Sequence, residues 1–210
     1  MAMSGSARAG DGFSLIELMV TLAVLGTLLL AVTPLVRDWM FDTEIRNAAE
    51  SISTGLSKAR AEAVRRNEPV LFSLVTNDNP GMLDNNCAVS STSASWVVSL
   101  DDPAGHCAEA LGTTTGTRLV ARHARGDGAP GVTVEVRDAR CQNATGQAQV
   151  LFNGFGRAQP APAPIRCIVV RHPGSATTRT LHVVLNSGGT VRTCDPAATD
   201  PRDTRRCLVN

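Results

Sequence analysis

The residues best suited to covalent chemistry are His106 and Cys107, which stand a few positions after Asp101 and Asp102. A thiol, an imidazole and a carboxylate are the groups of a nucleophilic centre, in which a base activates the thiol. Residues adjacent in sequence rarely supply that geometry, because nucleophile and base normally come from separate elements. The sequence therefore predicts that the protein is not an enzyme. No metal site and no cofactor are expected either, because the other histidines are isolated along the chain: His123, His172 and His182.

Disulfide formation is the chemistry that the six cysteines favour, because their number is even and all follow the apolar N-terminal stretch. None belongs to a C-x-x-C pair, so neither a zinc site nor a thioredoxin-type motif is predicted. We predict Cys194–Cys207, which closes a polar C-terminal loop, and Cys87–Cys107, which joins the two long loops around Trp96. That some cysteines are free buried thiols stays open as an alternative. The six are Cys87, Cys107, Cys141, Cys167, Cys194 and Cys207.

Glu17 is the single ionisable residue in the apolar stretch of residues 13–36. As a helix, this stretch would be about 36 Å long, enough to cross a hydrocarbon core of about 30 Å. A secretory signal peptide has a shorter apolar core and a small-residue cleavage site, which the stretch lacks; an ordinary signal anchor stays open. A carboxylate at membrane depth is costly and usually has a partner. We therefore expect Glu17 to pair with a cation on a neighbouring chain.

The string Gly12-Phe13-Ser14-Leu15-Ile16-Glu17 resembles the class III signal of type IV pilins and type II secretion pseudopilins. The resemblance implies that residues 1–12 are a leader, which a prepilin peptidase removes by cutting between Gly12 and Phe13. It also implies that the peptidase methylates the new N-terminal Phe13, and that Glu17 pairs with the N-terminal amine of the neighbouring subunit during fibre assembly.

Residues 37–68 predict that the helix continues as an amphipathic half. Apolar residues step by three or four positions along one stripe. Arg65 and Arg66 suit the negative end of the helix dipole, and Pro69 forbids continuation. One helix from Phe13 to Arg66 is expected, half of it a membrane anchor and half a packing helix. A helix lying on a membrane surface is the competing interpretation, but its polar face mixes both signs of charge. The stripe is Phe41, Ile45, Ala48, Ile52, Leu56, Ala59 and Ala63.

Residues 69–210 consist of short β-branched runs separated by turn residues, which predicts a β-rich exported domain. Residues 132–137 alternate valine with polar residues, as a strand with one buried face does. Residues 186–189 (NSGG) indicate a hairpin turn. The predicted fold class is therefore α+β, a long N-terminal helix packed on antiparallel sheets. The predicted strands are 70–75, 96–100, 118–122, 132–137, 148–152, 166–171, 179–185 and 190–193.

Two of these segments resemble one branch of the pilin-like proteins. Residues 95–102 (SWVVSLDD) are similar to the tryptophan strand of the FimT/GspH branch of minor pilins and pseudopilins. Residues 152–157 (FNGFGR) are similar to the later F-N-x-x-G-R segment of that branch. The resemblance implies that both segments help to fold the sheet. Trp96 is therefore expected to pack in the core rather than to bind a ligand.

The charges bear on possible partners. Twenty Lys plus Arg against nineteen Asp plus Glu give a net charge of +1, so a nucleic acid would need a local patch. From Arg157 onwards there are eight arginines against three aspartates. In the FimT branch a C-terminal G-R-x-R segment takes up DNA; residues 189–194 (GTVRTC) keep its glycine and second arginine. The resemblance makes Arg192 a candidate DNA-binding residue, with Arg205 and Arg206 if the Cys194–Cys207 loop brings them near. A solvated, charge-mixed end is the alternative.

These features together predict a minor pilin, a fibre subunit that helps to start or cap a type IV pilus. The alternative is the corresponding minor pseudopilin of a type II secretion system. The expected partners are other pilins or pseudopilins in a helical fibre, the prepilin peptidase and the inner membrane, with DNA as a further candidate. The expected location is a single pass through the inner membrane with the C-terminal domain in the periplasm, and the fibre at the cell surface after assembly.

Overall fold

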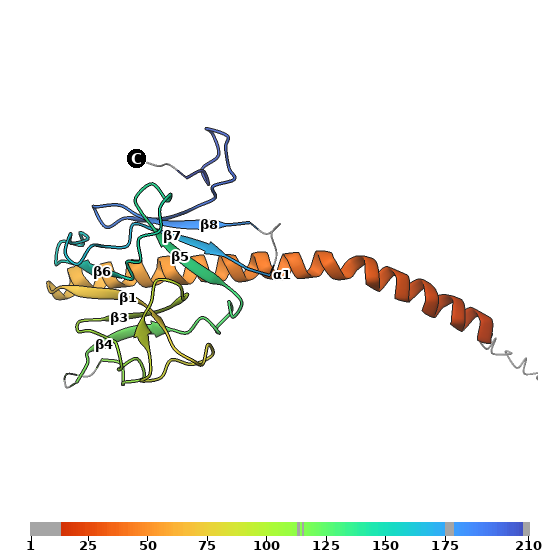
Figure 1. Ribbon diagram of the computed structural model, residues 1–210, viewed down its shortest axis with the longest axis horizontal. Coiled ribbons are helices and arrows are strands. Elements are labelled where there is room, and N and C mark those ends of the chain that lie inside the picture. Colours follow the sequence, from red (N-terminus) through yellow and green to blue (C-terminus); the bar gives the residue numbers. More distant parts are fainter. Residues whose placement is uncertain (1–13, 113, 115, 175–178, 208–210) are drawn as a thin grey trace, which may run out of the picture. The chain divides into compact units, whose positions relative to one another are not determined.

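The computed structural model describes residues 14–112, 114, 116–174 and 179–207, apart from the side chains of residues 31, 32, 34 and 35. The chain divides into two compact units, Met1–Arg37 and Asp38–Asn210. Within the described residues, the elements are one long helix and nine strands (Figure 1). They are α1 (Leu15–Arg66), β1 (Val70–Thr76), β2 (Ala88–Val89), β3 (Ser95–Ser99), β4 (Leu119–His123), β5 (Thr133–Arg137), β6 (Gln149–Phe152), β7 (Cys167–Arg171), β8 (Leu181–Leu185) and β9 (Val191–Cys194).

Local hydrogen bonds cap both ends of α1. The Ser14 hydroxyl accepts the Glu17 N–H at 3.2 Å, as a serine N-cap does. At the other end, Asn67 adopts a left-handed φ of 54° and donates its N–H to the Val64 carbonyl at 3.3 Å. The observed helix therefore ends at the predicted residue, and Phe13, where it was expected to begin, lies outside the described residues.

In the first unit, the described side chains of residues 14–30 are exposed. Among the described residues, no helix has an apolar stretch of the length that a bilayer crossing requires. The predicted membrane anchor, residues 13–36, includes Phe13 and four side chains that lie outside the described residues: those of Ala31, Val32, Pro34 and Leu35. The anchor stays a prediction.

The second unit contains two antiparallel sheets. In the first sheet the order is β2-β1-β3-β4, and β6 also pairs with β1. In the second sheet the order is β5-β7-β8-β9. The β8–β9 connection is the predicted hairpin: the Asn186 N–H donates to the Thr190 carbonyl at 3.1 Å, and Gly189 takes a φ of 83°. All eight predicted strands are present, and the α+β class is confirmed.

Strand β2 was not predicted. It has two exposed residues, Ala88 and Val89, inside a connection that the sequence marks as polar. Its pairing with β1 places Val89 opposite Val75, and the following Ser90 N–H donates to the Leu74 carbonyl at 3.0 Å. This segment is a strand because it pairs with β1, and not because its own residues alternate between apolar and polar.

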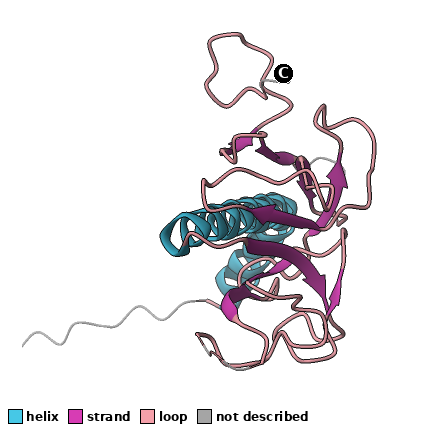
Figure 2. Ribbon diagram, turned by 90° about the vertical axis from the view of Figure 1, so that its left-hand side faces the viewer, coloured by secondary structure: helices cyan, strands magenta, loops and turns pink. Residues whose placement is uncertain are grey.

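Both sheets pack on the predicted apolar stripe of α1, where Ile45, Ile52 and Leu56 are fully buried. One contiguous core joins that stripe to the inner face of each sheet, and Figure 2 shows the strands gathered on one side of the helix. Strand residues enter the core at every second position, as the pleat requires. From the first sheet these include Phe72, Leu74, Trp96, Val98 and Phe152, and from the second Val134, Val136, Ile168, Val170 and Val183.

Candidate functional site

The N-terminal processing motif lies at the edge of the described residues. Gly12 and Phe13 lie outside them, so the cleavage site stays a prediction. Glu17 is exposed in the first turn of α1, where its own N–H is bonded to Ser14. A carboxylate in the first turn also suits the positive end of the helix dipole. The described part of the chain gives Glu17 no cationic partner within 4.0 Å.

The tryptophan strand is structural. Trp96 on β3 is 6% exposed and lies against α1, where its indole N–H donates to the Ser51 hydroxyl at 2.9 Å. Its ring stacks near Phe72 and His123, with ring centroids 5.9 and 5.8 Å away. Trp96 therefore belongs to the core, as the sequence predicted.

The FNGFGR segment ties the end of the first sheet to the helix. Phe152 is buried in the core, and the Asn153 side chain accepts the N–H groups of Phe155 and Arg157. The Gly156 carbonyl accepts the Arg60 guanidinium of α1 at 3.0 Å. The segment makes a turn that reaches back to the helix, which supports the implied role in folding.

The described cysteines form three disulfides: Cys87–Cys107, Cys141–Cys167 and Cys194–Cys207. Two of these are the pairs that the sequence analysis singled out, and no cysteine is left as a free thiol. Cys107 is therefore not a nucleophile beside His106, whose imidazole instead contacts Glu109 at 2.6 Å. Asp101, the nearby carboxylate, is held by Arg118 at 2.9 Å.

Cys87–Cys107 belongs to a small second core on the first sheet's outer face, the face turned away from α1. This core also contains Val75 and Val97 from the strands and Leu83 from the loop after β1. The disulfide thus fastens the two long loops, residues 77–87 and 101–117, over a sheet face that would otherwise expose apolar residues.

The second sheet also has a covered outer face, which two cross-strand rows define. In one row Arg137, Cys167, Val184 and Arg192 lie opposite one another on β5, β7, β8 and β9. In the next row the partners are Glu135, Val169, His182 and Cys194. Residues directly opposite one another point to the same face of a sheet, so Cys167 and Cys194 both point away from α1. Their disulfides fasten residues 138–147 and 195–207 to this face.

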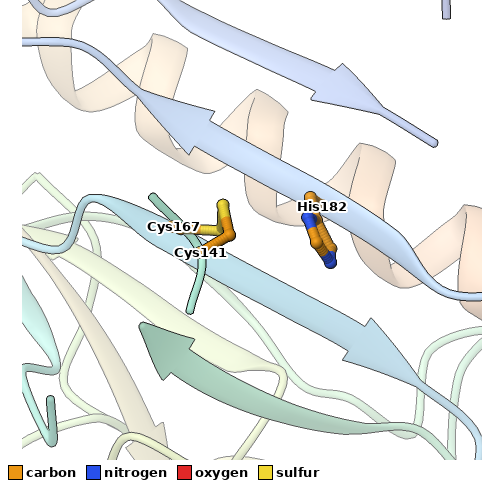
Figure 3. A group of neighbouring side chains, drawn as sticks. All are labelled: Cys141, Cys167 and His182. Atoms are coloured by element: carbon orange, nitrogen blue, oxygen red, sulfur yellow. A yellow bond between two sulfur atoms is a disulfide. The ribbon is translucent and has the colours of Figure 1, made fainter. Parts of the chain in front are cut away.

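His182 lies close to two disulfides, and Figure 3 shows it beside one of them, Cys141–Cys167. Its imidazole is within 4.8 Å of both sulfurs of Cys141–Cys167, and within 4.8 Å of both sulfurs of Cys194–Cys207. Burial lowers the pKa of His182, and the charge of Arg137 lowers it further. Sequence spacing could not reveal this cluster, because strand register creates it. As disulfides, the four sulfurs are not thiolates, which are the form of cysteine that binds metals.

Close to His182, a cavity of about 180 Å³ opens on the same outer face. Three arginines from separate elements line it: Arg166 before β7, Arg192 on β9 and Arg206 in the C-terminal loop. Ala139 and Arg206 stand on the two disulfide-bonded loops, and Val184 and Cys194 come from the sheet. We call this cavity the arginine pocket; Leu185, Asn186 and Thr190 complete its lining.

The structure brings together two of the three predicted DNA-binding arginines and separates the third. Arg192 and Arg206 line the arginine pocket, but Arg205 does not. Its guanidinium donates to both carboxylate oxygens of Asp203, at 3.1 and 2.8 Å. These hydrogen bonds lower the pKa of Asp203 from its ordinary 3.8 to about 2. Arg166 was missed, because its sequence position beside a strand cysteine gives no signal of a shared cavity.

Comparison with known proteins places the chain in a family. A family model described as type II transport protein GspH matches residues 48–189, and a model of the prokaryotic N-terminal methylation motif matches residues 8–33. No curated protein sequence matches the chain.

Two solved structures resemble the fold, both crystal structures of the type IV minor pilin FimU of Pseudomonas aeruginosa. The form in space group P21 has 16% identity and a TM-score of 0.45, over 76% of this chain and 94% of that chain. The form in space group P65 has 14% identity and a TM-score of 0.44, over 75% of this chain and 98% of that chain. Because the GspH model spans more than half of the sequence, the chain belongs to the GspH family and is a type IV pilin-like protein with an N-terminal methylation motif.

Proposed function

We propose that the protein is a minor pilin, a non-enzymatic fibre subunit that helps to start or cap a type IV pilus. The observation that carries the proposal is the match of residues 8–33 to the N-terminal methylation motif, followed by the helix α1 and a GspH-family domain. A subunit of this kind needs an N-terminal helix for the fibre and a folded domain for its surface. The same features suit the alternative, a minor pseudopilin of a type II secretion system.

In this proposal, residues 13–36 anchor the unassembled subunit in the inner membrane with the domain in the periplasm. The prepilin peptidase removes residues 1–12 and methylates the amine of Phe13. Glu17 then accepts the charged N-terminal amine of a neighbouring subunit. An ion pair of this kind offsets the cost of carrying a carboxylate into an apolar fibre interior.

Co-expression with a prepilin peptidase, followed by N-terminal sequencing and mass spectrometry, tests the processing. We expect a mature terminus at methylated Phe13 for the wild type and no cleavage of Gly12→Val. Glu17→Ala should be cut but excluded from fibres, whereas Glu50→Ala, which removes an exposed carboxylate farther along α1, should be cut and incorporated. A mature terminus other than Phe13 would contradict the proposal.

Gene deletion in the source organism separates the two machines. A minor pilin is required for pili and for motility driven by them, so deletion should abolish both and leave secreted enzymes unchanged. The reverse outcome would be normal pili together with loss of enzyme secretion, so that the enzymes stay inside the cell. That outcome would assign the protein to type II secretion.

DNA binding is a second candidate function, favoured by one observation: Arg192 and Arg206 share a pocket with a third arginine. Guanidinium groups bind phosphate oxygens through paired hydrogen bonds, so contact with the DNA backbone would be independent of base sequence. Anisotropy titration of a labelled duplex with the full-length protein tests it. Each neutralised phosphate should add roughly −0.9 to the log–log salt slope, and Arg192→Ala with Arg206→Ala should flatten that slope. Absence of binding at low ionic strength would exclude this function.

A further inference from the structure

The arginine pocket concentrates positive charge in a concave place. Three of its nine lining residues are arginines and none is acidic. In the described part of the chain, none of the three guanidinium groups has a carboxylate oxygen within 4.0 Å. Arg118, Arg137 and Arg205 all have such a partner, at 2.9, 2.9 and 2.8 Å. The pocket therefore gathers cations whose mutual repulsion a bound anion would relieve.

The donor set matches a phosphate group. A planar guanidinium presents parallel N–H groups that fit two oxygens of one phosphate. The side-chain oxygen Oδ1 of Asn186 already accepts the Thr190 N–H at 2.9 Å, which leaves the side-chain nitrogen Nδ2 of Asn186 as a donor. The Thr190 hydroxyl is another lining donor. Val184 and Cys194 add apolar surface beside the charges.

Disulfides hold the walls of this pocket. Arg166 and Arg206 are sequence neighbours of Cys167 and Cys207, which belong to the two disulfides close to His182. Among the residues that the structure describes, the C-terminal loop has one other backbone attachment at this point, a bridge between Asp195 and Arg206 in which the Asp195 N–H donates to the Arg205 carbonyl at 2.7 Å. Opening Cys194–Cys207 would therefore leave this bridge as the remaining described backbone attachment that keeps Arg206 near Arg192.

We propose that the arginine pocket is a phosphate-binding site that the Cys141–Cys167 and Cys194–Cys207 disulfides assemble. Its ligand is a phosphate group, either free or in the backbone of DNA. Only the DNA arm rests on the DNA-binding function proposed above; the phosphate site does not depend on it. The site is complete only in the oxidised protein, so the subunit acquires it after its domain is exported and its cysteines are paired.

Isothermal titration of inorganic phosphate into the full-length oxidised protein, kept in a non-ionic detergent, tests the ligand. Replacing one arginine should remove a charge-assisted pair of hydrogen bonds and weaken binding roughly tenfold or more. We expect this loss for Arg206→Gln and for Arg166→Gln. The matched control is Arg205→Gln, which removes a neighbouring arginine that Asp203 already holds. Absence of saturable phosphate binding, or equal losses for Arg205→Gln and Arg206→Gln, would overturn the proposal.

Removal of one disulfide at a time tests the assembly. Cys194→Ala with Cys207→Ala should abolish phosphate binding, and Cys87→Ala with Cys107→Ala should leave it unchanged, because that disulfide lies on the first sheet. Circular dichroism of both variants checks that the sheets remain folded. Equal effects of the two removals would overturn the assembly by disulfides. If Cys194→Ala with Cys207→Ala does not fold, Arg206→Gln and Arg205→Gln still decide the site itself.

A competition experiment tests whether DNA binds at the arginine pocket. It measures binding of a labelled duplex to the protein while inorganic phosphate is added as a competitor. DNA binding that phosphate displaces and that Arg206→Gln weakens supports the pocket as the contact. Phosphate binding without DNA binding supports the phosphate site and contradicts only the DNA function.

Discussion

At the scale of single residues, Asp101 and Arg118 form an ion pair between two partly exposed side chains. Asp101 accepts both the guanidinium and the backbone N–H of Arg118, across the neck of the loop between β3 and β4. Hydrogen bonds from the Arg118 side chain, and then from its backbone, lower the pKa of Asp101 from its ordinary 3.8 to about 2. The pair therefore stabilises the folded state by an amount that depends on pH.

Asp101→Asn should destabilise the protein at pH 7 by at most about 1 kcal/mol, because the Asp101 side chain is 39% exposed and water screens the pair. A depressed carboxylate pKa contributes stability above the unfolded-state value near 3.8, and that contribution is lost as the pH falls through about 2. Urea unfolding of variant and wild type should therefore give curves that differ at pH 7 and converge near pH 2. The control is Asp78→Asn, in an exposed loop. A difference that persists unchanged at pH 2 would mean that the ion pair is not its cause.

At the scale of elements, the distance between α1 and the first sheet depends on Gly55. A Cβ at this position would lie 2.8 Å from two ring atoms of Trp96 and 2.9 Å from the Phe72 ring. Real Cβ contacts are almost never this short, and both rings are buried in the core. The helix therefore approaches the sheet as closely as it does because residue 55 has no side chain.

Gly55→Ala sets two effects against each other. Alanine favours a helix over glycine by about 1 kcal/mol, but forcing an extra methyl into a packed core costs about 1–3 kcal/mol. Because the neighbouring atoms belong to rigid rings, we expect a net loss of stability in chemical denaturation. Thr54→Ala, one residue away on the exposed face, supplies the control and should be neutral or slightly stabilising. A more stable Gly55→Ala protein would show that α1 and the sheet are not in this close contact.

At the scale of the whole molecule, the second unit has what an independent domain requires. Its core joins residues 45–63 of α1 to both sheets, and disulfides fasten loops over the outer face of each sheet. Each disulfide stabilises such a domain by about 3 kcal/mol on chain-entropy estimates for loops of this size. The domain should therefore fold without the N-terminal half of the helix.

Residues 38–210, expressed in an oxidising compartment, should be soluble and monomeric. Intact-mass measurement after alkylation should find no free thiol without reductant and six after reduction, because all six cysteines are paired. Expression in a reducing compartment should lower the melting temperature or prevent folding. Six alkylated thiols in periplasmic material would contradict the three disulfides.

The sequence by itself determined the local parts of this protein. The three- and four-residue steps from Phe41 to Ala63 predicted the helix face, alternation predicted the strands, and NSGG predicted the β8–β9 turn. These signals are local, because each reports the conformation of a few consecutive residues. The processing motif is local in the same sense, and it pointed to the family before any fold was known.

Only the tertiary structure decided which distant residues share a surface. Strand register placed His182 beside two disulfides, and it brought Arg166 to Arg192 across the second sheet. The same folding left Arg205 with Asp203, although Arg205 and Arg206 are adjacent in the sequence. A sequence states which charges exist, but register and loop closure depend on the packing of the whole domain. The arginine pocket could therefore be found only after the fold was known.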